Sequence, residues 1–517
     1  MDTCSDVGLI GLSAPARKLA LGMLGQGIRL SVLAGAAGGP GAGGPAAAGA
    51  SSRSDALGGF MADLADGADG ADGADGADGA DGADGADGAD GADGGAARPF
   101  FAPGAAELVS GLSRPRRVIL ASAPDGNKDD YLSRIVALLD KDDILVDCLD
   151  AAWRDSGLKA DICSGRGIRY LELAFIGEPG GSGGGPSILA SGDAEAWRSV
   201  GPMVSEAAAR MADGSPCAAF LGPAGTSRFV RMVHNSLAGA DAEFVAETYH
   251  LLRASLRMSH DEMRMVFSEW NRTELASYLL GVTADVLGVR DEDGEALVEK
   301  VLDSAGQDLA GLQAAEAALE LGCPAGLFAD AAFARNLSIL KDERVGASAV
   351  LGGAKAAATG ERQAMIEDLR RALLAARIIG YSEGFTLLRW ASEAYGWSLD
   401  LARIALAWRE GCFVSASILD SIAEAYKREN GLASLLLDSR LKSALDASLP
   451  ALRKTAARAM EQGVPVPGFS SAISFFDGYR STWLPASLIA AIKDRAASSG
   501  YERIDRPRGE SFHSDWK

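Results

Sequence analysis

The amino-terminal third of the chain alternates short apolar runs with helix-like stretches. The runs "VGLIGL" (7–12) and "IRLSVLA" (28–34) flank the helix-like "SAPARKLALGMLGQG" (13–27). The same alternation resumes further on, where "RVILASA" (117–123) and "DDILVDCLD" (142–150) are apolar runs with β-branched residues and turn signals. Strands that alternate with helices form parallel sheets, so the pattern predicts an α/β domain with a Rossmann-like sheet.

The period of the apolar positions becomes helical near residue 200 and stays helical to about residue 465. Residues 369–397 are apolar nearly all round, which is typical of a helix inside a large bundle. The end of the chain is rich in prolines and glycines and finishes with polar residues, which favours an irregular tail that packs on another surface. The pattern predicts three parts: a Rossmann-like dinucleotide-binding domain (1–199), a large all-helical domain (200–470) and a carboxy-terminal tail (471–517).

A low-complexity insert (36–98) interrupts the first part. It begins with Gly, Ala and Pro and contains ten Ala-Asp-Gly triplets from Ala65 to Gly94. The aspartates repel one another along the strand, and few apolar groups are present to offset the entropy of ordering the segment. We therefore expect a disordered acidic insert.

Composition excludes several classes of protein. The formal net charge of −20 argues against nucleic acid or an anionic membrane as a partner. No apolar run reaches the roughly 18 residues of a membrane span, and the amino terminus lacks the basic segment of a secretory signal. The six cysteines form no CxxC pair, which favours reduced thiols over disulfides or a zinc site. These features predict a cytoplasmic protein without a bound metal.

The loop after the first apolar run lies where a Rossmann phosphate loop belongs. Its small residues are Gly11, Ser13 and Ala16, a degenerate form of the glycine-rich pattern. Pro15 removes an N–H that would face phosphate, and the end of the second run offers no acid for a ribose hydroxyl. This loop predicts a Rossmann sheet retained for folding, with weak or absent nucleotide binding.

Several downstream stretches carry a resemblance to a known family. The chain resembles the 6-phosphogluconate dehydrogenase (decarboxylating) family, the NADP-dependent oxidative decarboxylases of the pentose phosphate pathway. This resemblance implies a Rossmann-like domain, an all-helical domain that forms a homodimer, and a tail that threads into the partner subunit. The stretches that carry it, in the family's order, are "PRRVIL" (115–120), "GPSIL" (185–189), "FVRMVHN" (229–235), "DSAGQ" (303–307), "FARNLSILKDER" (333–344), "IALAWREGC" (404–412) and "SFFDGYR" (474–480).

The resemblance implies that proton transfer occurs along the helix that contains "FVRMVHN". The family's general base, a lysine, corresponds to Arg231, whose guanidinium stays protonated in proteins and cannot take the substrate's proton. The family's general acid, a glutamate, corresponds to Ala238, which has no proton to give. His234 and Asn235 are retained, and Gly239 replaces a tyrosine that binds the substrate phosphate.

The implied substrate positions are also altered. The family's "KGTG" loop, which holds the sugar phosphate, reads "DLAG" here, so Asp308 brings a negative charge and Ala310 lacks a hydroxyl. Like charges in contact disfavour binding. The substrate loop aligns with Gly177, and a phosphate-binding arginine is retained as Arg335. Asn235 would contact the substrate as well.

The implied cofactor and partner positions follow the same trend. Asp150 replaces an asparagine that touches both nicotinamide and substrate, and residues 34–36 lack the side chains that select NADP. NADP is therefore the expected cofactor only if a nucleotide is bound. The tail residues that the partner subunit supplies correspond to Lys493 and Ser499.

Three hypotheses from different classes follow. The first is a catalytically inactive or strongly impaired 6-phosphogluconate dehydrogenase-like protein, which acts as a structural or regulatory homodimer or as a heterodimer with an active relative. The second is a working NADP-dependent enzyme that converts 6-phosphogluconate to ribulose 5-phosphate. The third is a dehydrogenase of another hydroxy acid that uses His234 and Asn235 with a different base. Joint loss of the base, the acid and most phosphate ligands favours the first, because one substitution could be compensated more easily than several.

Overall fold

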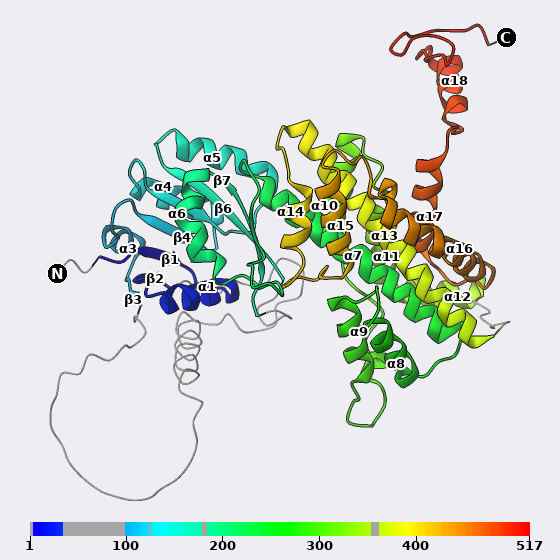
Figure 1. Cartoon of the computed structure of the whole chain (residues 1–517), viewed down its shortest axis with the longest axis horizontal. Coiled ribbons are helices and arrows are strands. Elements are labelled where there is room, and N and C mark those ends of the chain that lie inside the picture. Colours follow the sequence, from blue (N-terminus) through cyan, green and yellow to red (C-terminus); the bar gives the residue numbers. More distant parts are fainter. Residues whose placement is uncertain (1–3, 35–98, 124–125, 178–183, 353–360, 517) are drawn as a thin grey trace, which may run out of the picture.

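The computed structural model has an α/β domain at one end of an elongated molecule and a helical domain at the other (Figure 1). The predicted fold class, a Rossmann-like domain followed by a large all-α domain, is confirmed. The predicted disordered insert lies outside the described residues. The structure describes residues 4–34, 99–123, 126–177, 184–352 and 361–516.

The sheet has the strand order β3-β2-β1-β4-β5-β6-β7-β8. Neighbouring strands are parallel except for β6 and β7, which pair antiparallel between Leu171–Gly192 and Ile176–Ser187. The order reverses between β1 and β4, which pair directly, and such a reversal opens a crevice at the carboxyl ends of the strands. The strands are β1 (Val7–Ile10), β2 (Leu30–Leu33), β3 (Phe100–Phe101), β4 (Arg117–Leu120), β5 (Ile144–Asp147), β6 (Arg169–Ile176), β7 (Ser187–Gly192) and β8 (Ala218–Phe220).

Helices cover both faces of the sheet because the buried strands are apolar on both sides. α1 (Ala14–Gly25) and α6 (Ala194–Ser205) share one apolar cluster with the sheet. α3 (Ala105–Ser110), α4 (Lys128–Leu138) and α5 (Ser156–Ser164) share the cluster on the opposite face.

Strand β8 differs from the expectation that the chain is helical beyond residue 200. Ala218, Ala219 and Phe220 pair parallel with β7 and complete the sheet. The strand is short and contains no β-branched residue, so its sequence has no strand signal. The domain limits at residues 199 and 470 stay predictions; the first falls inside α6 and the second inside α17 (Pro467–Arg480).

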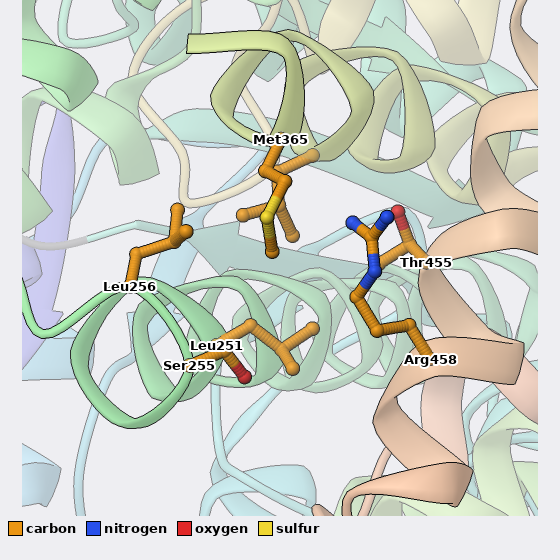
Figure 2. Close-up of a pocket in the computed structure, with 7 residues that line it drawn as sticks. Leu251, Ser255, Leu256, Met365, Thr455 and Arg458 are labelled. Atoms are coloured by element: carbon orange, nitrogen blue, oxygen red, sulfur yellow. The ribbon is translucent and has the colours of Figure 1, made fainter. Parts of the chain in front are cut away.

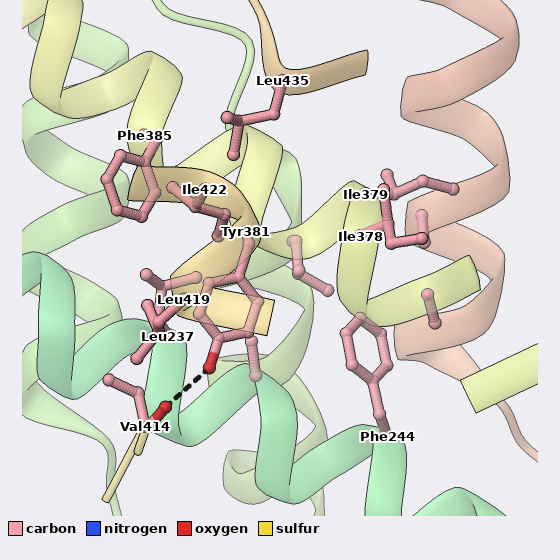
Figure 3. Packing of buried hydrophobic residues seen from close by; sticks show 14 of the residues in the cluster. Leu237, Phe244, Ile378, Ile379, Tyr381, Phe385, Val414, Leu419, Ile422 and Leu435 are labelled. Carbon is pink, nitrogen blue, oxygen red and sulfur yellow. Dashed lines mark hydrogen bonds between the residues drawn. The ribbon is translucent and has the colours of Figure 1, made fainter. Parts of the chain in front are cut away.

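Three long helices form the centre of the helical domain: α7 (Thr226–Ala254), α13 (Arg362–Tyr395) and α16 (Ser439–Glu461). Figure 3 shows the apolar side chains between them, including Leu237, Phe244 and Tyr381. The Tyr381 hydroxyl donates to the carbonyl of Val414 at 3.0 Å, so the one polar group of that side chain is satisfied. The surrounding helices are α8 (His260–Trp270), α9 (Tyr278–Gly288), α10 (Leu309–Leu321), α11 (Gly326–Ile339), α12 (Lys341–Leu351), α14 (Leu401–Ala407) and α15 (Ile418–Arg428).

The carboxy-terminal part contains two helices, so the expectation of an irregular tail is wrong for residues 471–480 and 486–497 and describes only residues 481–485 and 498–516. Pro467 is the first residue of α17, a position where its missing N–H is not needed and its fixed φ suits the helix. A second helix, α18 (Ala486–Ala497), projects away from the body of the molecule (Figure 1). This helix leaves Leu488 and Ile492 mostly exposed, and the segment before it leaves Trp483 mostly exposed.

One buried carboxylate organises this projecting arm, which we define as residues 486–516. Asp494 is only 4% exposed and accepts hydrogen bonds from Gly500 N (3.0 Å), Ser514 N (3.1 Å) and Trp516 Nε1 (2.7 Å), with His513 Nδ1 at 2.8 Å. These bonds hold the end of α18 and the segment after it in one compact unit. They also keep the pKa of the Asp494 carboxyl well below its usual range, first through Trp516.

Candidate functional site

Helix α7 carries most of the residues that the sequence nominated for catalysis. Arg231, Asn235 and Ala238 are spaced four and three residues apart, which places them on one face of the helix. This face is partly open: Asn235 is exposed, whereas Arg231 and Ala238 are half-buried. The structure therefore places these three residues along one face of the amino-terminal half of α7.

Arg231 forms an ion pair with Asp150, which follows strand β5 at the carboxyl edge of the sheet. Lys128 Nζ also donates to the Asp150 carbonyl at 2.8 Å. The sequence analysis named Arg231 and Asp150 separately and missed their pairing. The available signal was that the two side chains carry opposite charges. The ion pair connects the carboxyl edge of the sheet to α7, and its two charges neutralise one another.

His234 lies on the inner side of the same helical turn and is fully buried. Its Nδ1 is 2.9 Å from Asn235 Oδ1, and its ring meets the Trp408 ring edge-on at 5.4 Å between centroids. Burial lowers the pKa of His234 to about 4, while the hydrogen bond to Asn235 opposes that shift. The imidazole is therefore neutral at pH 7 and is a weak base.

Arg335 on α11 approaches the same face of α7 further along the helix. Its Nη1 lies 3.2 Å from Asp308 Oδ2. Asp308 is also the N-cap of α10, because its Oδ1 accepts the Gly311 N–H at 3.0 Å. The arginine that the resemblance assigns to phosphate binding is thus paired within the protein.

The dinucleotide loop sits where the strand order reverses. Gly11 has φ of +86°, and a Cβ there would lie 1.9 Å from Ser122 Oγ, so only glycine fits between β1 and β4. Ser13 is exposed at the start of α1, whereas Ala16 is buried against the sheet. Although Pro15 removes one donor, the exposed helix start and its small residues fit the pyrophosphate of a dinucleotide.

Two nominated substrate residues lie apart from this face of α7. Gly177 has φ of +94°, and a Cβ there would overlap the Gly411 carbonyl oxygen at 1.9 Å. Glycine is thus needed at position 177 because the end of β6 approaches the loop after α14 closely. Lys493 belongs to the projecting α18 (Figure 1). Within a single chain it therefore does not lie beside the other nominated residues.

A buried charge network lies beside the site, and the sequence analysis missed it. Arg228 donates to Asp147 Oδ2 at 2.8 Å and to Ser156 Oγ at 3.0 Å, and its Nη1 is 3.3 Å from Glu172 Oε2. Glu172 Oε1 also accepts the Gly225 N–H at 2.6 Å. The signal was a single acid inside each of two apolar runs, "ILVDCL" and "YLELAF". The network fixes the start of α7 to strands β5 and β6.

A small cavity lies at the opposite end of α7 from Arg231. Figure 2 shows Leu251, Leu256 and Met365 around it, with Thr455 and Arg458 on one side. Its volume of about 20 Å³ holds roughly one water molecule. At 1.5 Å per residue, the cavity is roughly 30 Å from Arg231 along the helix axis, so it is not part of this site.

Among the described residues, no group of three or more His, Cys, Asp or Glu side chains could hold a metal ion. Within the same part of the chain, no helix is both long enough and apolar enough to cross a membrane.

The fold and the crevice define a two-domain protein in which a dinucleotide-binding α/β domain precedes a helical domain. Residues 94–222 match the family model for the NAD binding domain of 6-phosphogluconate dehydrogenase, and residues 227–516 match that for the 6-phosphogluconate dehydrogenase C-terminal domain. The chain belongs to the 6-phosphogluconate dehydrogenase family, and the resemblance found in the sequence is confirmed.

Individual relatives match this chain over most of their length. The chain is 40% identical over 416 residues to the decarboxylating 6-phosphogluconate dehydrogenase of Rattus norvegicus, covering 80% of this chain and 86% of the relative. It is 38% identical over 410 residues to that of Haemophilus influenzae, covering 79% and 85%. The structure of Plasmodium falciparum 6-phosphogluconate dehydrogenase superposes with a TM-score of 0.85 at 27% identity, covering 99% of this chain and 100% of that chain.

Proposed function

We propose that this chain is a 6-phosphogluconate dehydrogenase-like protein whose cleft does not oxidise 6-phosphogluconate at an enzyme-like rate, and that it acts as a structural or regulatory homodimer. The ion pair between Arg231 and Asp150 carries this proposal. It places two oppositely charged, mutually engaged side chains at the point where the family resemblance implies a proton acceptor.

The chemistry of the reaction explains why the pair matters. Oxidation of a hydroxyl needs a group that accepts its proton as hydride leaves, and such a group works best when its pKa is near the working pH. Arg231 stays protonated, the Asp150 carboxylate is engaged by Arg231, and the pKa of His234 is lowered to about 4 by burial. Ala238 supplies no proton for the later steps.

Nucleotide binding is a separate part of the proposal. The structure of the Plasmodium falciparum relative is described in complex with its cofactor NADP+. In this chain the turn at Gly11 and the exposed start of α1 at Ser13 would hold the pyrophosphate. When bound, the nicotinamide would supply a hydride acceptor. We propose that NADP binds weakly, because Ala34 offers no group to a 2′-phosphate and Pro15 removes one donor.

Exposed apolar side chains support association with a second copy of the chain. Single exposed apolar residues are ordinary, whereas several on adjacent helices mark an interaction surface. They occur on α10, α11 and α12 and on the projecting arm, and a second copy would cover both sets at once. They include Leu312, Leu319, Phe333, Leu337, Val350, Leu351, Leu488, Ile489 and Ile492.

Turnover of 6-phosphogluconate with NADP tests the proposal directly. We expect no NADPH formation near the roughly 1 s⁻¹ of slow enzymes, and a rate above that value would overturn the proposal. The variant Arg231→Lys combined with Ala238→Glu should gain activity by about tenfold or more, since a general acid or base typically contributes at least that much. Arg253→Lys, at an exposed position near the other end of α7, is the matched control and should gain nothing.

A working NADP-dependent 6-phosphogluconate dehydrogenase is the second candidate. The identity of 38–40% to decarboxylating relatives over more than 400 residues favours it. This candidate predicts that NADPH and CO₂ appear together in the unmodified protein and that Arg231→Lys leaves the rate unchanged or lower. Affinity purification of a tagged copy of this chain after co-expression with an untagged active relative would distinguish the two dimers, because only a heterodimer brings the relative with it.

A further inference from the structure

Asp308 and Arg335 form a charge pair that faces α7. Asp308 is 8% exposed and Arg335 is 25% exposed, so this pair is more sheltered than that of Arg231 with Asp150. The backbone holds Asp308 in place because it caps α10 through Gly311. One carboxylate oxygen therefore has a structural partner, and the other is directed at the guanidinium.

Gly239 on α7 provides the space for this pair. A Cβ at Gly239 would lie 2.6 Å from Asp308 Oδ2 and 3.4 Å from Arg335 Nη2. The shorter distance is below any ordinary contact, so a side chain at this position would displace the Asp308 carboxylate. The three residues Gly239, Asp308 and Arg335 are thus mutually dependent. Because Gly239 has no side chain, the Asp308 carboxylate has space beside α7 to pair with Arg335.

A second acid contributes to the balance of charge. Glu243 follows Gly239 by one turn of α7, and the attraction of Arg335 opposes the rise that burial causes in the pKa of Glu243. Arg335 is therefore shared between two acidic side chains of the protein. An incoming anion would meet a guanidinium that is already neutralised and a carboxylate at close range, which disfavours binding.

We propose that Asp308 is an internal counter-ion that occupies the anion position of Arg335, so that this part of the cleft rejects phosphate-bearing ligands and accepts a ligand whose end is an uncharged hydroxyl group. Asp308 is then a specificity-determining residue. This inference concerns binding and does not rest on the absence of turnover.

Asp308→Asn tests the inference with little change in shape. Asparagine is as good an N-cap as aspartate, so α10 should be retained, and an unchanged thermal unfolding midpoint confirms it. We expect the affinity for inorganic phosphate and for 6-phosphogluconate, measured by calorimetry, to rise by at least about tenfold relative to the unmodified chain. Gluconate, which lacks the phosphate, should bind with the same affinity to both proteins.

Asp303→Asn is the matched control. Asp303 precedes α10 as well, but it pairs with Lys341 and Arg344 instead of Arg335. Asp303→Asn removes the same charge at a position that does not pair with Arg335. We therefore expect its phosphate affinity to equal that of the unmodified chain. The gain in Asp308→Asn should disappear when Arg335→Gln is added.

Equal phosphate affinity in Asp308→Asn and the unmodified chain would overturn the inference. An equal gain in Asp303→Asn would overturn it too, because the effect would then be one of net charge. Should Asp308→Asn unfold, Asp308→Ser keeps a capping oxygen and gives the same comparison. Turnover of 6-phosphogluconate by the unmodified chain would overturn both the proposed function and this inference, because the phosphate-bearing substrate must bind first. Absence of turnover together with equal phosphate affinity in Asp308→Asn and the unmodified chain would overturn this inference alone.

Discussion

Arg228 and Arg231 lie one turn apart on α7 and have opposite surroundings. Arg228 has 1% of its side chain exposed and meets Asp147 and Glu172, both completely buried. Arg231 is 23% exposed, and its one ion-pair partner among the described residues is Asp150, whose side chain is 78% exposed. The first arginine holds the helix to the sheet, so the fold depends on it. The second lies on a partly open face of α7, where the fold places little restriction on its identity.

The largest expected effect comes from Arg228→Met. The substitution leaves the buried Glu172 without its cation and leaves Asp147 with Lys159 Nζ at 3.8 Å. Breaking a buried ion network in this way typically lowers the free energy of unfolding by about 3–5 kcal/mol. Urea unfolding followed by circular dichroism measures the loss. The exposed Arg253→Met is the control and should change the midpoint little. If Arg228→Met lowers the free energy of unfolding by less than about 1 kcal/mol, the buried Arg228 stabilises the fold no more than an exposed arginine does.

A buried acid that forms no ion pair among the described residues sharpens the comparison. Glu383 on α13 is 1% exposed and accepts the Leu327 N–H at 3.2 Å at the start of α11. Burial raises its pKa from 4.5 to about 8. The folded state therefore binds this proton more tightly than the unfolded state, so its contribution is complete below pH 4.5 and is lost as pH rises to 8.

Glu383→Gln should remove this dependence. At pH 8.5 the variant should be more stable than the unmodified chain by on the order of 2 kcal/mol, and at pH 4.5 the two should be equal. Urea unfolding at both values measures the difference. Glu393→Gln, on the same helix but exposed, is the control. Equal stability at both pH values would mean that Glu383 ionises without difficulty where it lies.

The smallest expected effect belongs to Arg231→Met. Because its partner is mostly exposed, the pair should contribute less than about 1 kcal/mol to the free energy of unfolding. Urea unfolding beside Arg228→Met gives the comparison in one experiment. A loss as large as that of Arg228→Met would show that the cleft pair supports the fold.

Much of the fold was predictable because strands and helices of the first domain carry clear periodicities. Strand β8 was missed, since Ala218 and Ala219 have no strand preference and their pairing depends on β7. The helices of the carboxy-terminal part were missed because Pro467 was treated as a sign of irregular chain, although proline is favoured at the first position of a helix.

The candidate site was predictable only as separate positions. The resemblance singled out Arg231, Asp150 and Asp308, but sequence does not state which of them touch. Contacts between residues 81 positions apart, such as Arg231 with Asp150, depend on how the sheet and α7 are joined. The need for glycine at position 239 became visible only when Asp308 and Arg335 were placed beside it.

The arm that ends the chain has a practical consequence for handling the protein. Three of the four donors around Asp494 come from His513, Ser514 and Trp516, within the final few residues. Deleting these residues would strand a nearly buried carboxylate opposite Gly500 N alone. Purification tags are therefore better attached at the amino terminus, where they do not extend from residues that brace the arm.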